Sequence, residues 1–135
     1  MSEYNQSMRV YIEDTDCGGI VYHANYLKYM ERARSDFMRK YGYEHTSSEK
    51  EGFILVVASL SLNFKASAKM DDLIDVGVKI TKVSSSSVIM EQLITRNGQL
   101  LVSGEIKIAS IATSSGKLCS MSETLKTNLK LKLAE

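Results

Sequence analysis

The run Glu13-Asp-Thr-Asp-Cys-Gly-Gly-Ile-Val-Tyr-His-Ala-Asn-Tyr26 joins two segments whose apolar residues follow different periods. Residues 8–13 on its N-terminal side are rich in β-forming residues and predict a short strand. On its C-terminal side, apolar residues recur at the spacing of one buried helix face, which predicts a long helix over residues 24–41. Gly42 is well placed to end that helix. The run therefore places acids, glycines and a histidine between a strand and a helix start.

These residue types suit attack on a carbonyl group. Gly18 and Gly19 allow the backbone to turn sharply and to approach a ligand closely. The first turn of the following helix is expected to offer unpaired N–H groups and the positive end of a dipole. Asp16 would lie beside this helix start, where a developing oxyanion is stabilised. The alternative is that Asp16 only satisfies backbone donors, as a turn or N-cap residue.

The rest of the chain predicts an antiparallel sheet. Four further strands are expected, over residues 53–64, 73–83, 88–96 and 99–112. Asn97-Gly98 is a strong hairpin signal between the last two. The predicted order is strand, helix and four strands without βαβ repetition, so we expect an α+β fold in which a five-stranded antiparallel sheet packs around one long helix.

Three shorter segments complete the prediction. They are a frayed N-terminus over residues 1–7, a short helical turn within 45–52 and a terminal helix over 122–134. The last strand is expected to place one set of side chains on a single face, namely Val102, Gly104, Ile106, Ile108 and Ser110.

Length and composition limit the classes of function. At 135 residues, with 44% hydrophobic residues, the chain is expected to form a single globular domain over 1–135. A formal net charge of +1 gives no bulk attraction to nucleic acid or to an anionic membrane. Two cysteines are too few for a disulfide framework. Because neither a leader pattern nor an apolar run of membrane-spanning length is visible, we expect a cytoplasmic protein without membrane insertion.

Two segments resemble a known family. Residues 11–34, Tyr-Ile-Glu-Asp-Thr-Asp-Cys-Gly-Gly-Ile-Val-Tyr-His-Ala-Asn-Tyr-Leu-Lys-Tyr-Met-Glu-Arg-Ala-Arg, resemble the signature of the hotdog-fold acyl-CoA thioesterases. The resemblance is to the branch that contains 4-hydroxybenzoyl-CoA thioesterase and the bacterial Tol–Pal-associated (YbgC-like) thioesterases. Residues 64–73 are more loosely similar to the family segment Phe-x-x-Pro-Ala-x-x-Gly-Asp-x-Leu, with Ser67 in place of the proline.

The resemblance implies a catalytic carboxylate and its partners. The second acid of the family's Asp-x-Asp motif falls on Asp16, which would act either as a general base on water or as a nucleophile. The backbone N–H of His23 is implied as the oxyanion donor, and the imidazole of His23 as an active-site group. The alternative is that the His23 side chain only caps the helix start or packs against its neighbours. Residues implied to bind substrate and shape the loop are Gly19, Tyr22, Asn25 and Tyr26.

The resemblance also implies the reaction partners. The expected substrate is a short or medium acyl thioester of CoA or of acyl carrier protein, with no metal and no organic cofactor. The expected assembly is a homodimer or homotetramer, with active sites between subunits. In the 4-hydroxybenzoyl branch a basic turn holds the nucleotide phosphates, but residues 84–87 are all serine here. That departure leaves acyl carrier protein open as the donor.

Other readings of the same residues remain. A non-catalytic acyl-binding or scaffold protein, linked to envelope lipid machinery, is the alternative from another class. A hotdog dehydratase is the enzymatic rival. Cys17 is a conceivable nucleophile, although no His/Asn constellation accompanies it. Asp14 could join Asp16, Cys17 and His23 in a metal site, although the spacing matches no familiar one. Otherwise Glu13 and Asp14 are expected to be structural.

Overall fold

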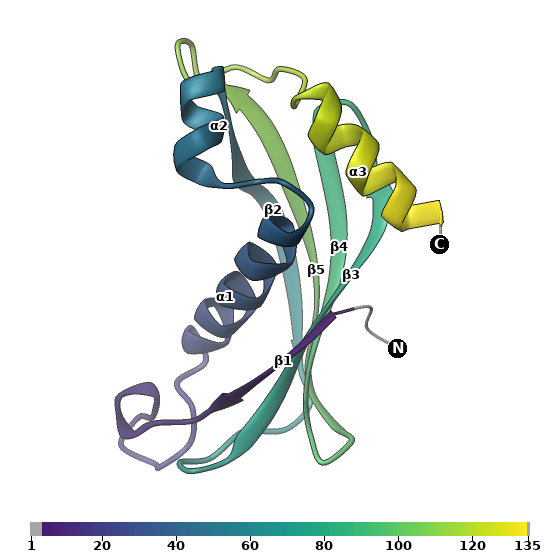
Figure 1. The fold of residues 1–135 in the computed structure, drawn as a ribbon. Helices are drawn as coiled ribbons and strands as arrows, with labels where there is room; N and C mark the ends of the chain where they lie inside the picture. The colour runs from purple at the N-terminus through teal and green to yellow at the C-terminus, as the bar shows by residue number, and fades with distance from the viewer. Residues whose placement is uncertain (1–3, 135) are drawn as a thin grey trace.

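The computed structural model describes residues 4–134. Nine elements follow one another within these residues: β1 (Tyr4–Arg9), η1 (Ile12–Asp14), α1 (Asn25–Lys40), α2 (His45–Glu51), β2 (Phe53–Phe64), β3 (Leu73–Val83), β4 (Ser87–Arg96), β5 (Gln99–Ala112) and α3 (Glu123–Ala134). Figure 1 labels the strands and the α-helices. The strands form one antiparallel sheet in the order β1-β3-β4-β5-β2. The predicted α+β class and five-stranded sheet are confirmed.

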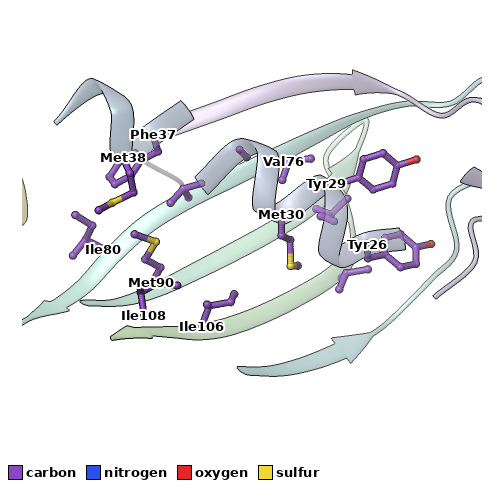
Figure 2. Packing of buried hydrophobic residues seen from close by; sticks show 14 of the residues in the cluster. Tyr26, Tyr29, Met30, Phe37, Met38, Val76, Ile80, Met90, Ile106 and Ile108 are labelled. Atoms are coloured by element: carbon purple, nitrogen blue, oxygen red, sulfur yellow. The ribbon is translucent and has the colours of Figure 1, made fainter. Parts of the chain in front are cut away.

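The long helix α1 runs along one face of the curved sheet (Figure 1). Its buried residues recur at helical spacing: Tyr26, Tyr29, Met30, Ala33, Phe37 and Met38. Figure 2 shows the Met30 side chain pointing from the helix toward the strands. Alternate residues of β3, β4 and β5 face them from the sheet, as period-two strands require. The face predicted for β5, from Val102 to Ser110, is buried throughout. One continuous core therefore lies between α1 and the sheet.

The terminal helix α3 covers the same core beside the end of α1. Its Leu125 and Leu129 are buried among the core residues. The Asn128 side chain donates a hydrogen bond to the Tyr41 carbonyl, 3.0 Å away, just after α1 ends. The predicted terminal helix is thus confirmed, and it fixes the C-terminal end of α1 on the sheet.

The predicted hairpin is present between β4 and β5. Asn97 and Gly98 have φ values of 50° and 81°, the left-handed pair that a tight hairpin turn needs. Among the described residues, no helix is long and apolar enough to cross a membrane.

The N-terminal prediction was wrong in two places. Residues 4–7, expected to fray, belong to β1 because Tyr4 to Arg9 pair with β3 from Val78 to Leu73. Residues 12 and 13, expected to be the last residues of the strand, belong with Asp14 to the 3-10 turn η1 (Ile12–Asp14). The Asp14 carboxylate accepts the Tyr11 N–H at 2.9 Å and closes that turn. Residues 1–3 of the frayed segment lie outside the described part of the chain.

The two edges of the sheet differ in character. The edge strand β1 is short, with six residues, whereas the edge strand β2 has twelve. On β2, Val57, Leu60 and Phe64 are 45%, 43% and 51% exposed. Val57 and Leu60 pair with the buried Ile108 and Ile106 of β5, so they lie on the face of the sheet that carries the helix. A long, apolar edge of this kind is a surface for pairing with another strand.

Candidate active site

The loop between η1 and α1 folds back on itself and exposes Asp16. Thr15 and Val21 form an antiparallel bridge across it. Inside the bridge the Asp16 N–H donates to the Ile20 carbonyl at 2.9 Å, and the Gly19 N–H donates to the Asp16 carbonyl at 3.1 Å. Gly19 has a φ of 79°, which a side chain at this position would disfavour. The glycine thus makes the tight turn that presents Asp16.

The Asp16 carboxylate has one bound oxygen and one free oxygen. Its Oδ1 accepts the Gly18 N–H at 2.8 Å, so the residue does hold the turn, as the alternative reading expected. Within residues 4–134, its Oδ2 has no hydrogen-bond partner, and the side chain is exposed. A turn role and a chemical role are therefore compatible, because the turn orients one oxygen and leaves the other to a ligand.

The sequence predicts unpaired backbone N–H groups in the first turn of the helix, but in the structure they lie just before α1. The first three N–H groups of the helix, from Asn25 to Leu27, donate to the carbonyls of Tyr22, His23 and Ala24. These short bonds use the donors of the first turn. Among the described residues, the backbone N–H groups of His23 and Ala24 have no acceptor. The unpaired donors thus lie one step before the helix, on the loop side.

The His23 imidazole packs against aromatic rings at this point. Its centroid lies 4.6 Å from that of Tyr22 and 6.5 Å from that of Phe64, the latter edge-on. The ring is exposed and, within the described residues, has no hydrogen-bond partner. Both ring nitrogens are therefore free to meet a ligand.

A cavity of about 320 Å³ joins the loop to the segment that follows β2. Its wall combines two groups of residues, from the loop and helix (Asp16, Ile20, Val21, His23 and Tyr26) and from residues 64–67 (Phe64, Lys65, Ala66 and Ser67). The Val21 N–H donates to the Ala68 carbonyl at 2.9 Å, and the Ala68 N–H donates to the Tyr26 hydroxyl at 3.0 Å. These bonds hold the two segments together across the cavity.

The predicted substrate-binding residues have different places. Tyr26 is buried and lines the cavity. Gly19, Tyr22 and Asn25 lie outside the cavity wall. Tyr22 is exposed beside the His23 ring, and the Asn25 side chain donates to the Asp14 carbonyl at 2.9 Å. In this chain Asn25 therefore holds the loop in place, which was the other part of its predicted role.

The cavity residues 64–67 were missed as site residues by the sequence analysis. The sequence feature that could have indicated them is the looser family resemblance over residues 64–73, from which no site residue was assigned. Their position depends on the long-range bonds to Val21 and Tyr26. No local pattern in the sequence predicts such bonds.

The rival sites do not form. Cys17 is exposed and does not line the cavity. In the described part of the chain, no three His, Cys, Asp or Glu side chains come together to form a metal site, so Asp14, Asp16, Cys17 and His23 do not form a ligand set. Asp14 instead accepts hydrogen bonds from Tyr11, Tyr22 and Asn25, the structural role expected of it.

An ion pair fixes the outer wall of the cavity. Arg96 donates to the Asp72 carboxylate at 2.6 Å and to the Ser67 carbonyl at 3.2 Å. The same carboxylate oxygen accepts the Lys69 N–H at 2.8 Å. Burial alone would raise the pKa of Asp72, but the Lys69 N–H and the Arg96 guanidinium together lower it below its usual value.

We therefore expect Asp72→Asn to destabilise the fold near neutral pH and to have progressively less effect in acid. A carboxyl with a lowered folded pKa contributes stability above its unfolded pKa, and this is lost as the pH falls through the folded value. Urea unfolding of the wild type and the variant at pH 7 and about pH 3 measures the difference. Asp71→Asn, at an exposed neighbour, is the matched control. A destabilisation that does not change with pH would contradict the ionic role.

Comparisons with known proteins show the family to which the chain belongs. The family model described as the thioesterase-like superfamily matches residues 10–129. The acyl-CoA thioesterase YbgC of Haemophilus influenzae is 37% identical over 105 residues, 77% of each chain. Its namesake from Helicobacter pylori strain 26695 is 40% identical over 84 residues, 62% of this chain and 61% of that one. A solved structure of a probable thioesterase from Bartonella henselae has a TM-score of 0.82 at 33% identity, covering 88% of this chain and 98% of that chain.

Proposed function

We propose that Asp16 is the catalytic carboxylate of this chain, which belongs to the thioesterase-like superfamily and, like its YbgC relatives, is an acyl-CoA thioesterase. One observation carries the proposal. Asp16 and His23 line the same small cavity, and within residues 4–134 one oxygen of the Asp16 carboxylate and the backbone N–H of His23 have no hydrogen-bond partner. A general base or nucleophile and an oxyanion donor are the two parts that thioester hydrolysis needs.

Two routes fit this arrangement. As a general base, Asp16 takes a proton from water while the water oxygen bonds to the thioester carbon. As a nucleophile, Asp16 itself bonds to that carbon, and water then cleaves the mixed anhydride. In both routes the carbonyl oxygen gains negative charge, which the free backbone donors stabilise, and the C–S bond breaks to release the thiol. The His23 imidazole, which also lines the cavity, would donate to that oxygen or pass the proton to the leaving thiolate.

The cavity supports a short or medium acyl group. Much of its wall is apolar, formed by Ile20, Val21, Tyr26, Phe64 and Ala66, and its volume is about 320 Å³. Such a wall binds a hydrocarbon chain by removing its surface from water. Lys65 also lines the cavity and is exposed, where it can meet polar parts of the carrier. The expected cytoplasmic location stays a prediction.

We propose a homodimer that pairs β2 with β2 of a second copy. The exposed edge of β2 carries Val57, Leu60 and Phe64, and Phe64 also lines the Asp16 cavity. Pairing two such edges would cover these side chains and extend the sheet. The cavity would then be closed by the second copy. The association of two such dimers into a tetramer stays a prediction, and we assign no surface to it.

A panel of acyl-CoA and acyl-carrier-protein thioesters, monitored by release of free thiol, tests the proposed function. Turnover of at least one short or medium acyl thioester is expected. Binding of acyl groups without turnover of any thioester would instead favour the non-catalytic scaffold. Hydration or dehydration of the acyl chain with the thioester intact would favour the dehydratase.

The nucleotide part of CoA is expected to contribute little to catalysis. The turn over residues 84–87 is closed by its own serines, with Ser84 and Ser87 hydroxyls 2.6 Å apart and no basic side chain among them. Charged contacts to phosphate would be stronger than neutral ones. We expect kcat/KM for an acyl-CoA and for the same acyl-pantetheine to differ only modestly, and added salt to matter little. A large preference for CoA that salt removes would mean that Lys65 or Lys69 holds the phosphates.

A further inference from the structure

A second cavity, of about 390 Å³, lies between α1, α2 and β2. Its apolar wall includes Met38, Tyr43, Leu55, Val57 and Ile108. Arg34 and Arg39 of α1 also line it, and Arg39 is paired with Asp36 at 3.2 Å. None of these residues belongs to the Asp16 cavity. An apolar wall with a guanidinium that has no ion-pair partner among the described residues resembles the binding site of a chain that ends in an acidic group.

Arg34 has a neutral partner and no paired carboxylate. Its guanidinium donates to the side-chain oxygen of Gln92 at 2.9 Å, and the fully buried Gln92 donates in turn to the Met30 carbonyl at 2.9 Å. Among the described residues, no carboxylate lies within ion-pair distance of Arg34. Glu31, one turn earlier, accepts the Ser35 hydroxyl at 2.6 Å instead.

This arrangement leaves Arg34 with donors to spare. A guanidinium has five N–H donors in a rigid fork, and the structure shows one of them in use. Burial lowers the pKa of Arg34, while Glu31 acts in the opposite direction, and a guanidinium nevertheless stays protonated in proteins. A half-buried charge oriented by a buried amide is suited to bind a carboxylate with two parallel hydrogen bonds.

The two cavities lie at opposite ends of β2. The Arg34 cavity contacts Leu55 and Val57, and the Asp16 cavity contacts Phe64. Leu55 and Phe64 are nine residues apart in one strand, a separation of about 30 Å. One short acyl group cannot reach both cavities of a single chain. Antiparallel pairing of two β2 edges about their middle, however, brings the start of one strand to the end of the other.

We propose that Arg34 of one subunit binds a carboxylate at the far end of an acyl group whose thioester lies against Asp16 of the other subunit. The preferred substrate class is then the CoA thioester of a dicarboxylic acid. A singly charged carboxylate suits this site better than a phosphate, because Arg39 is already paired with Asp36 while Glu31 and Glu44 also line the cavity. This inference rests on the proposed function and its dimer.

The first test compares two acyl groups of equal length. Adipoyl-CoA ends in a carboxylate and hexanoyl-CoA in a methyl group. We expect the wild type to favour adipoyl-CoA, and Arg34→Gln to reduce the ratio of the two kcat/KM values at least about tenfold, as loss of a charged hydrogen bond predicts. Arg34→Lys keeps the positive charge but not the paired N–H donors of the guanidinium, so it should keep part of the preference for adipoyl-CoA. Arg32→Gln, at an exposed position of the same helix outside both cavities, should not change the ratio.

The second test asks whether Arg34 acts across subunits. Mixed dimers of Asp16→Asn and Arg34→Gln chains, purified with two tags after co-expression, contain one site with both native residues and one with neither. They should regain the wild-type preference for adipoyl-CoA. If Arg34 instead served the Asp16 of its own chain, every active site of the mixed dimer would lack it, and the preference would stay lost. That result would overturn the proposal.

A third readout is independent of turnover. By calorimetry, adipamate, whose only charge is one carboxylate, is expected to bind the wild type more tightly than hexanamide, which has no carboxylate, and Arg34→Gln is expected to remove the difference. Equal binding of adipamate and hexanamide would overturn the inference, and so would an Arg34→Gln variant that loses the preference only because it dissociates into monomers. Hydrolysis of both thioesters without preference would overturn it while leaving the thioesterase proposal intact. Adipamate bound through Arg34 without hydrolysis of any thioester would instead reject the Asp16 mechanism and keep the anion site.

Discussion

Asp16→Asn is expected to reduce kcat/KM on the best thioester substrate by at least about 10²–10⁴-fold, the contribution of positioned proton transfer. The structure indicates that this substitution changes the reactive oxygen without disturbing the loop. The asparagine oxygen can still accept the Gly18 N–H, so the turn keeps its bond. Only the basic or nucleophilic oxygen is replaced. Thiol release under substrate excess measures the loss, and circular dichroism and light scattering report fold and assembly.

Asp71→Asn provides the matched control for that variant. Asp71 is exposed and has a φ of 73°, a conformation that asparagine adopts readily, so the same chemical change should be tolerated there. Its activity is expected to remain that of the wild type. Near-normal turnover by Asp16→Asn would remove Asp16 from the mechanism. A parallel loss in both variants would point to a general effect of the lost charge.

Leu60→Lys is expected to convert a dimer into a folded monomer and to lower activity on the order of 10²-fold. Leu60 lies on the exposed edge strand β2 and is 43% exposed, so a single chain tolerates the lysine. Two lysines at the edge would oppose strand pairing, since charged edge residues block it. Without the second copy the acyl group is poorly held, and small misplacements of reacting atoms are costly.

Light scattering at micromolar concentration checks this prediction, together with thiol release. The wild type should have the mass of at least a dimer. Leu131→Lys, at a 64% exposed position on α3, is the control and should leave mass and activity unchanged. A monomeric wild type with full activity would rule out the shared site. A Leu60→Lys dimer would place the interface elsewhere.

The local elements were predictable because their signals are local. The repeat of apolar residues along α1 placed the helix within one residue at each end, at Asn25 and Lys40. Alternation of residues set β2, β3 and β5 to their observed bounds, and Asn97-Gly98 marked the hairpin. The boundary at β1 was missed because Tyr4 to Ser7 are mostly polar, and their strand conformation comes from pairing with β3.

The sequence by itself determined that Asp16 follows a strand and precedes a helix, because glycines and an amphipathic repeat act over a few residues. Tertiary structure alone decided which side chains meet it. Phe64 and Lys65 reach the cavity through bonds from Ala68 to Val21 and Tyr26, and Arg34 meets Gln92 across 58 residues. Among the described residues, the structure also leaves without an acceptor the N–H of His23, which the resemblance implied as a donor, and that of Ala24, which it did not. Such contacts depend on how the helix packs on the sheet, and packing is a property of the whole core rather than of any short segment.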